Sequence, residues 1–277
     1  MRRLVPDWVI YLLALCGVLW AIFSSSSTQD SPNTLPEAIE REGATLPPAS
    51  AFDERVLVQV SRPKDGIGTA FAVNEEGYWL TARHVVDGCD DVALLVAPGQ
   101  YIKVRDVTVS EQYDLALIET SSSQYPVALD TSADLRVGTF GYHVGYPQGR
   151  PGEAASRLLS RSNLISNGER NGSESVLAWA ETGRTRGLMG SLGGLSGGPV
   201  YDENGLVRGV IVAESPRRGR IYTASPEAVS QFINEHDVSL IGERPRPFSP
   251  DSYGREADYA RRNLQVVKVA CQVDEPS

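Results

Sequence analysis

The chain of 277 residues is poor in the side chains that build metal centres and disulfide frameworks. It has three cysteines and three histidines, and no two cysteines are spaced as C-x-x-C. This scarcity argues against a zinc cluster, and we expect neither a metal nor a cofactor. An excess of basic residues is also missing, because 26 Lys and Arg stand against 35 Asp and Glu. The net charge of −9 excludes the basic surface that a nucleic-acid partner needs.

Internal repeats are absent, and most apolar runs are short. Runs of this kind, separated by turns rich in glycine, asparagine and aspartate, are typical of an all-β protein. The first set of predicted strands is 55–60, 68–73, 78–81, 92–97, 101–109 and 115–119. The second set is 139–144, 157–162, 176–181, 198–201, 206–212 and 220–223. Each set of six is sufficient for a small antiparallel barrel, with the division between them near residues 121–126.

One segment without charge, residues 8–23, follows Arg2 and Arg3 and precedes serine-rich, acidic sequence. As a helix it is about 24 Å long, close to the ~30 Å of a hydrocarbon core. The flanking charges place the N-terminus in the cytoplasm, so residues 1–23 are predicted to be a transmembrane helix that anchors an extracytoplasmic protein. Trp8 and Trp20 near its ends favour a retained anchor. The alternative is a signal peptide cleaved within residues 24–27, which gives a secreted protein.

The remaining composition divides the chain further. Residues 24–52 are rich in serine and proline and are predicted to be a flexible linker. A folded domain is expected over 53–242, ending in a helix that opens at Ser225-Pro226-Glu227 with a cap, a proline and an acid. A C-terminal extension, 243–277, is polar and proline-rich up to residue 262 and then alternates as a strand over 263–273.

A serine lies among four glycines in the stretch Gly193-Gly194-Leu195-Ser196-Gly197-Gly198. Glycine permits positive φ, so the N–H groups of Gly194 and Ser196 can point at one spot and hold an oxyanion. Taken alone, the stretch is equally compatible with a surface turn. Upstream, His84 follows a predicted strand and Asp114 begins another. A histidine, an aspartate and a serine are the three side chains that acyl transfer uses.

Three blocks around these residues resemble the signature blocks of trypsin-like serine proteases, in particular the bacterial HtrA (Deg) branch. They are T-A-R-H-V-V at 81–86, D-L-A-L-I at 114–118 and G-L-S-G-G-P-V at 194–200. Two weaker blocks, V-G-Y-P-Q-G at 144–149 and I-Y-T-A-S-P at 221–226, support that branch. The resemblance covers about residues 55–236. It implies a chymotrypsin-like fold of two six-stranded antiparallel β-barrels over 53–242, with a C-terminal helix.

The resemblance also implies the roles of individual residues. Ser196 is the expected nucleophile, His84 the general base and Asp114 the residue that orients the histidine. Gly194 and Ser196 form the expected oxyanion hole. The substrate-binding strand is expected at Val212, Ala213 and Glu214.

The chain departs from the family at three places. The 35 residues after the last predicted helix are too few for the PDZ domain that many HtrA-type proteases carry. Arg83 replaces the small or amide residue that is usual before the histidine. Leu195 stands where zymogen-type relatives use an aspartate to bind a newly cut N-terminus, so we expect no activating cleavage.

Two cysteines bear on the compartment. Cys89 follows the histidine block closely, and Cys271 lies on the apolar side of the last predicted strand. In a domain outside the cytoplasm, a disulfide between them would tie the tail to the first barrel. Two separate buried thiols are the alternative.

The sequence therefore predicts a membrane-anchored serine endopeptidase that acts on polypeptide substrates outside the cytoplasm. Two alternatives remain. One is a catalytically latent binding or chaperone-like module, and the other is an esterase that uses the same three side chains.

Overall fold

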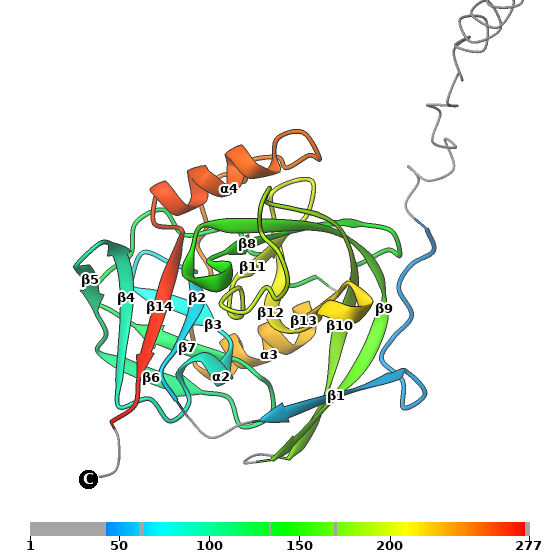
Figure 1. Cartoon of the computed structure of the whole chain (residues 1–277), viewed down its shortest axis with the longest axis horizontal. Coiled ribbons are helices and arrows are strands. Elements are labelled where there is room, and N and C mark those ends of the chain that lie inside the picture. The colour runs from blue at the N-terminus through cyan, green and yellow to red at the C-terminus, as the bar shows by residue number, and fades with distance from the viewer. Residues whose placement is uncertain (1–42, 61–63, 133, 169–170, 275–277) are drawn as a thin grey trace, which may run out of the picture. The chain divides into compact units, whose positions relative to one another are not determined.

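Two β-sheets carry the fold of the computed structural model, which describes residues 43–60, 64–132, 134–168 and 171–274 (Figure 1). The strands of the first sheet, in spatial order, are β5 (Gln100–Lys103), β4 (Asp91–Ala97), β14 (Val266–Gln272), β2 (Gly66–Ala72), β3 (Tyr78–Thr81), β7 (Ala116–Glu119) and β6 (Asp106–Val109). Those of the second are β1 (Glu54–Val60), β9 (Gly152–Gly168), β10 (Gly172–Arg184), β13 (Arg220–Ala224), β12 (Val207–Ser215), β11 (Pro199–Tyr201) and β8 (Phe140–Gly145).

The predicted mostly β architecture in two parts is confirmed, but the count of six antiparallel strands per part is wrong for the described residues. Each sheet has seven strands: the second gains β1, whereas the first exchanges β1 for β14 and has two strands, β5 and β6, in place of the predicted strand 101–109. β1 leaves the first set and pairs parallel with β9 of the second sheet. β14 lies antiparallel between β2 and β4. Alternating hydrophobicity identifies a strand but not its partner, which is a long-range property.

The strands themselves follow the expected pattern, with two differences. The predicted strand 101–109 divides into β5 and β6. β9 and β10 are much longer than predicted and form a hairpin that runs well beyond the buried residues. Polar residues at its outer end break the apolar alternation, and for that reason sequence periodicity reveals only its middle.

Large buried side chains fill two apolar clusters. The larger contains Phe71, Trp79, Tyr142 and Phe232. The smaller surrounds Trp179 and includes Leu192 and Leu195, the residue before Ser196. The apolar core therefore reaches directly under the glycine-rich stretch.

The helix predicted from Ser225-Pro226-Glu227 is present as α3 (Pro226–Glu235). The hydroxyl of Ser225 caps it by accepting the Ala228 N–H at 3.3 Å. Val229, Phe232 and Ile233 are buried on its inner face. Capping and one apolar stripe are thus sufficient to account for this helix.

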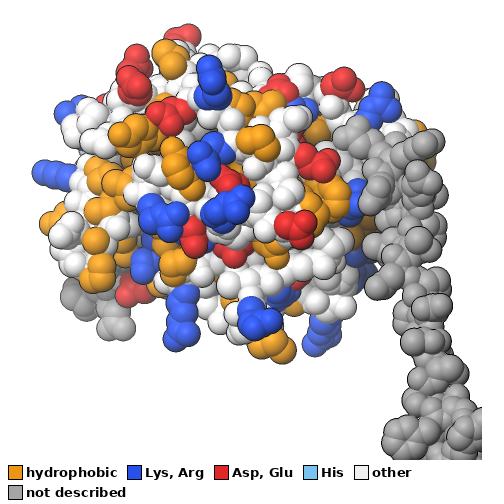
Figure 2. All heavy atoms as spheres, turned by 90° about the horizontal axis from the view of Figure 1, so that it is seen from above, with side chains coloured by type: hydrophobic (Ala, Val, Ile, Leu, Met, Phe, Trp, Pro, Cys, Tyr) orange, Lys and Arg blue, Asp and Glu red, His pale blue; other side chains and the backbone are white. Residues whose placement is uncertain are grey.

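A second long helix, α4 (Tyr253–Arg262), lies where the sequence predicted only a polar, proline-rich stretch. Its buried positions are Glu256, Ala257, Ala260 and Arg261, so half of its inner face is charged. Hydrophobic periodicity cannot detect such a face. Figure 2 views the molecule from the α4 side and shows basic and acidic side chains interspersed over that surface.

Part of the predicted linker packs on the second sheet. The Leu46 N–H donates to Leu135 O at 2.7 Å, and the Leu46 side chain is 5% exposed within the smaller cluster. The predicted membrane anchor, residues 1–23, lies outside the described residues. Among the residues described, no helix combines the length and the apolar character needed to cross a bilayer.

Candidate active site

His84 and Asp114 meet at the ends of two neighbouring strands of the first sheet, β3 and β7. His84 lies in α2 (Arg83–Val86), one short turn after β3, and Asp114 lies in the turn that enters β7. The distance from His84 Nδ1 to Asp114 Oδ2 is 2.6 Å, and the backbone N–H of His84 donates to Asp114 Oδ1 at 2.9 Å. Since the carboxylate can only accept, Nδ1 carries the proton and Nε2 is the free base.

The electrostatics of this pair favour a charged aspartate. Burial acts to raise the pKa of Asp114, but the His84 charge and hydrogen bonds outweigh it and hold the pKa below its usual value. Burial likewise acts to lower the pKa of His84, and the charge and hydrogen bond of Asp114 more than offset this, so the pKa is raised. The His84 side chain keeps 40% of its surface exposed, whereas that of Asp114 is 13% exposed. The histidine is therefore accessible to a reactant while its partner is enclosed.

Arg83, which departs from the family pattern, supports the pair from below. Its guanidinium is buried, and Nη1 donates to Ser110 O at 2.7 Å and to Tyr113 O at 3.1 Å. These bonds tie the helix that carries His84 to the loop that carries Asp114. No residue pattern predicts this role for Arg83, because the acceptors of these two bonds are backbone carbonyls.

A neighbouring loop fixes the orientation of the peptide between Gly193 and Gly194, just before Ser196. Gly193 O accepts the N–H of Gln148 at 2.6 Å. A trans peptide is planar, so the N–H of Gly194 points away from Gln148, on the opposite side of that peptide. Gly194 has φ +95°, and a Cβ there would lie 2.6 Å from Tyr146 O. Glycine is thus required for this orientation of the peptide.

Two backbone donors beside the serine are unpaired. The N–H of Leu195 bonds to Leu192 O at 2.9 Å, and that of Gly197 bonds to Ile211 O at 2.7 Å. Within the described part of the chain, the N–H groups of Gly194 and Ser196 have no acceptor. Most backbone donors in folded proteins are paired, so two free donors this close together suggest a binding site for an acceptor. They are what an oxyanion hole requires.

The serine loop adjoins the histidine segment. Thr69 of β2 donates its N–H to Ser196 O and its hydroxyl to Gly194 O, both at 2.8 Å. The next residue, Gly197, lies so close to Thr81 and Ala82 that a Cβ would be 2.9 Å from Ala82 N. The fold thus brings the Ser196 loop against the residues that lead into His84.

The loop at residues 145–152 that positions Gln148 is itself fixed by α4. The buried guanidinium of Arg261 donates to Gly152 O at 3.1 Å and to Gly145 O at 3.4 Å, the two ends of that loop. Its other nitrogen bonds to Glu153 at 2.9 Å and to Asp258 at 2.6 Å. The C-terminal extension therefore supports the loop whose Gln148 bonds to Gly193.

The predicted substrate-binding residues lie on β12, beside the serine loop. Ile211 of that strand bonds to Gly197 and Gly198 through its carbonyl and its N–H. Val212 is buried, and Ala213 and Glu214 are half-buried. The Glu214 carboxylate accepts the Leu192 N–H at 2.8 and 2.9 Å and the Ser191 hydroxyl. Glu214 is thus occupied in holding the turn before the glycines.

Cys89 and Cys271 form a disulfide in the structure, with their Cα atoms 5.5 Å apart and 182 positions between them in the sequence. The bond joins the end of the α2 segment to β14. His143, to which the sequence assigned no function, is fully buried against Ser156 and Trp179. Burial lowers its pKa to about 3, so it stays neutral and differs sharply from His84.

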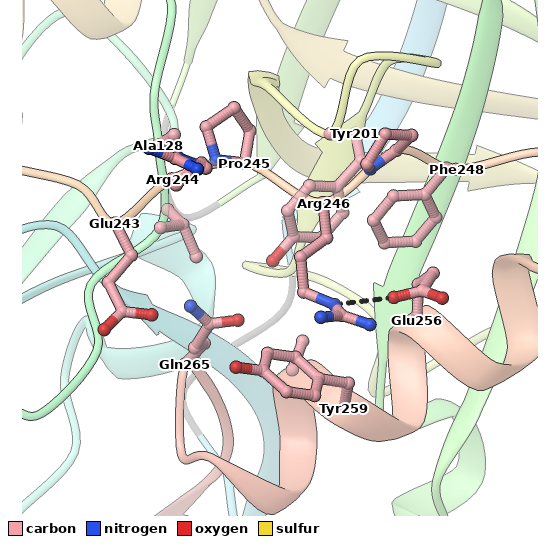
Figure 3. A pocket seen from close by; sticks show the side chains of 14 residues that line it. Ala128, Tyr201, Glu243, Arg244, Pro245, Arg246, Phe248, Glu256, Tyr259 and Gln265 are labelled. Atoms are coloured by element: carbon pink, nitrogen blue, oxygen red, sulfur yellow. Dashed lines mark hydrogen bonds and ion pairs between the residues drawn. The ribbon is translucent and has the colours of Figure 1, made fainter.

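A cavity of about 600 Å³ lies elsewhere, between the C-terminal extension and the second sheet (Figure 3). None of His84, Asp114 and Ser196 lines it. Arg246, which points into it, is paired with Glu256 at 2.8 Å and stacks on the Tyr259 ring at 4.1 Å. The charges that line the cavity are thus largely compensated, and its lining offers no nucleophile beside a base. The described residues also contain no cluster of side chains suited to a metal ion.

The comparisons with known proteins agree with this geometry. Residues 68–210, more than half of the chain, match the model of the family described as a trypsin-like peptidase domain. A probable periplasmic serine endoprotease of Halomonas elongata, named DegP-like, is 29% identical over 104 residues. A probable periplasmic serine protease of Haemophilus influenzae, named do/HhoA-like, is 30% identical over 151 residues. These relatives carry DegP-like and do/HhoA-like names, so the predicted resemblance to the HtrA (Deg) branch is confirmed.

The matches cover limited parts of those relatives. The first covers 37% of this chain and 22% of the Halomonas protein, and the second covers 53% of this chain and 31% of the Haemophilus protein. Among solved structures, the active form of the Rv3671c protease from M. tuberculosis aligns with a TM-score of 0.51 at 16% identity. That alignment covers 74% of this chain and 100% of the other, and it supports the fold. The chain belongs to the family of trypsin-like peptidase domains.

Proposed function

We propose that the chain is a serine endopeptidase that hydrolyses peptide bonds of protein substrates through an acyl-enzyme, with Ser196 as nucleophile. One combination of features carries this proposal. His84, whose ring Nδ1 and backbone N–H both bond to the Asp114 carboxylate, lies beside a serine loop in which, among the described residues, two N–H groups are unpaired. The names of the similar proteins, which are serine proteases and endoproteases, support the same reaction class.

The proposed reaction uses only groups of the chain and water. Ser196 Oγ forms a bond to the substrate carbonyl carbon, its proton passes to Nε2 of His84, and the carbonyl electron pair moves to the oxygen. The N–H groups of Gly194 and Ser196 stabilise that oxyanion. Asp114 stays ionised and keeps the Nδ1 proton in place. His84 then protonates the leaving amine, and a water molecule repeats the sequence to release the acid.

The proposed specificity is for small or aliphatic side chains. Val212 and Ala213 would lie along the bound substrate, and neither offers a charge. Both Glu214 carboxylate oxygens already accept the Leu192 N–H and one accepts the Ser191 hydroxyl, so these oxygens are occupied as acceptors before a basic substrate residue could bind them. A survey of cleavage sites in a denatured protein mixture tests this preference. Cleavage concentrated after Lys or Arg would contradict it.

The proposed location is outside the cytoplasm, with residues 1–23 as a membrane anchor. The Cys89–Cys271 disulfide supports an oxidising compartment, and the similar proteins are named periplasmic. An anchored protein stays in the membrane fraction after an alkaline wash. A mature N-terminus within residues 24–30 would instead identify a cleaved signal peptide.

The test of the proposed chemistry is labelling with a fluorophosphonate probe, together with peptide turnover. We expect Ser196→Ala and His84→Ala each to lose about 10⁴-fold in turnover, and Asp114→Asn a comparable amount. Ser239→Ala, at an exposed position after the end of α3, is the matched control and should keep wild-type turnover. Absence of wild-type labelling would favour a latent binding module, and turnover of esters without peptides would favour an esterase.

A further inference from the structure

A second carboxylate lies beside the His84–Asp114 pair. Glu174, in the outer part of β10, accepts the backbone N–H of Asp114 with both carboxylate oxygens, each at 3.2 Å. It is opposite Leu164 in the β9–β10 hairpin, so the second sheet reaches across to the loop of the first sheet that holds Asp114. Neither the motifs nor the proposed reaction uses this residue.

The groups around Glu174 leave it without a cation in direct contact among the described residues. The charged or titratable groups that face it are Arg83 and His84 of α2 and Tyr113 and Asp114 of the adjoining loop, with Glu235 of α3 beyond Tyr113. Arg83 Nη1 donates to carbonyls of that loop, and His84 donates to Asp114. Two carboxylates thus share one histidine, and only one of them contacts it.

The pKa values of Glu174 and Asp114 are shifted in opposite directions. Burial first, and then the charge of Asp114, raises the pKa of Glu174 to about 7. The pKa of Asp114 stays low, because the His84 charge and hydrogen bonds outweigh its burial. Glu174 therefore changes charge in the range in which a histidine base is titrated.

We propose that Glu174 is a positioning residue for the reaction, whose carboxyl group holds the backbone of Asp114 and whose charge tunes the basicity of His84. The proposal rests on the triad proposed above. Ionised Glu174 accepts the Asp114 N–H more strongly than the neutral acid does, because a charged acceptor makes the stronger hydrogen bond. Its negative charge also stabilises protonated His84, so the pKa of His84 rises. As the pH increases, ionisation of Glu174 delays the loss of the His84 proton.

The sign of the expected pH effect follows directly. Removal of the Glu174 charge lowers the pKa of His84, so the free base forms at lower pH. The rise of kcat/KM with pH should therefore move to lower pH in Glu174→Gln, by about half a unit. Glutamine keeps a carbonyl acceptor for Asp114, so kcat on the plateau should stay within about threefold of the wild type.

Two further variants separate charge from position. Glu174→Asp keeps the charge but shortens the side chain, so its pH profile should stay near that of the wild type while kcat falls. Glu174→Ala removes both, so it should combine the shifted profile with a loss of about tenfold in kcat at unchanged KM. Glu76→Gln, an exposed residue in a turn of the first sheet, removes the same formal charge and should change neither quantity.

The decisive readout does not require activity. The chain has three histidines, so their imidazole resonances can be assigned by NMR and that of His84 can be followed as a function of pH. We expect the His84 midpoint to move to lower pH in Glu174→Gln and in Glu174→Ala, with His236 as the internal reference. An unchanged His84 midpoint in a folded variant would overturn this proposal, whatever the turnover. If the wild type showed no turnover but the His84 midpoint still moved in the Glu174 variants, only the proposed function would be refuted.

Discussion

Both ends of the described chain return to the sheets, but they are held in different ways. At the N-terminal end, β1 is an edge strand that pairs only with β9, and residues 43–46 attach through a few backbone hydrogen bonds. At the C-terminal end, β14 has a partner strand on each side and a disulfide, and the preceding helix α4 carries the buried ion pair of Arg261 with Glu153. The C-terminal segment is therefore part of the interior, whereas the N-terminal segment covers a surface.

The difference matters for the candidate site because the C-terminal segment contacts the two elements that hold the serine loop. Lys268 of β14 pairs with Thr69 of β2, and Thr69 holds the carbonyls of Gly194 and Ser196. Arg261 fixes the loop whose Gln148 holds Gly193. Thr69 and Gln148, which bond to the serine loop, are thus held in turn by Lys268 and Arg261, residues that the family motifs do not include.

Deletion is expected to separate the two ends most strongly. Removal of residues 263–277 takes the middle strand out of the first sheet and breaks the disulfide, so we expect no cooperative thermal unfolding, as followed by circular dichroism. A chain that begins at residue 51 keeps β1 and should unfold cooperatively at a somewhat reduced temperature. Equal melting of the two truncated chains would show that the ends contribute alike.

The next largest effect is expected at Arg261. Arg261→Met leaves the Glu153 carboxylate buried without its partner, which should lower the free energy of unfolding by about 3–5 kcal/mol. The same change should lower kcat, because the ends of the Gln148 loop lose their donor. Arg262→Met, at the exposed neighbouring position, should change stability by less than about 0.5 kcal/mol in urea unfolding. Similar losses in the two variants would rule out a special role for Arg261.

The smallest of the three effects is expected at the N-terminal end. Leu46→Ala removes a buried side chain from the edge of the smaller cluster and should cost about 2 kcal/mol. Leu57→Ala is the matched control, because Leu57 lies on β1 with 69% of its surface exposed. Its free energy of unfolding should stay within about 0.5 kcal/mol of the wild type. If Leu46→Ala proved equally silent, residues 43–46 would be no more than a surface attachment.

Sequence reasoning succeeded where the signal is local. Strand positions follow from alternation, and α3 follows from its cap and stripe. His84 and Asp114 lie in blocks that their neighbours identify, and the structure brings these two side chains into contact. Gly194 is recognisable because only glycine accepts the required φ.

The features that were missed depend on contacts between distant residues. β14 was recognised as a strand, but its place between β2 and β4 is a property of the whole sheet. α4 was missed because Glu256 and Arg261 occupy positions where a helix usually buries apolar residues. Glu174 was missed because its partner is a backbone N–H 60 positions away. No pattern of residue types encodes such a bond.

The position of β14 also sets an order of events in the life of the molecule. The ribosome makes β2 and β4 long before the strand that belongs between them, since β4 ends at Ala97 and β14 begins at Val266. Until then both neighbouring strands have an open edge, which invites pairing with other chains. Thr69 meanwhile lies on an unsupported strand, so the serine loop lacks its scaffold. A nascent chain should therefore acquire its proposed proteolytic activity only after β14 has been made and has paired with β2 and β4.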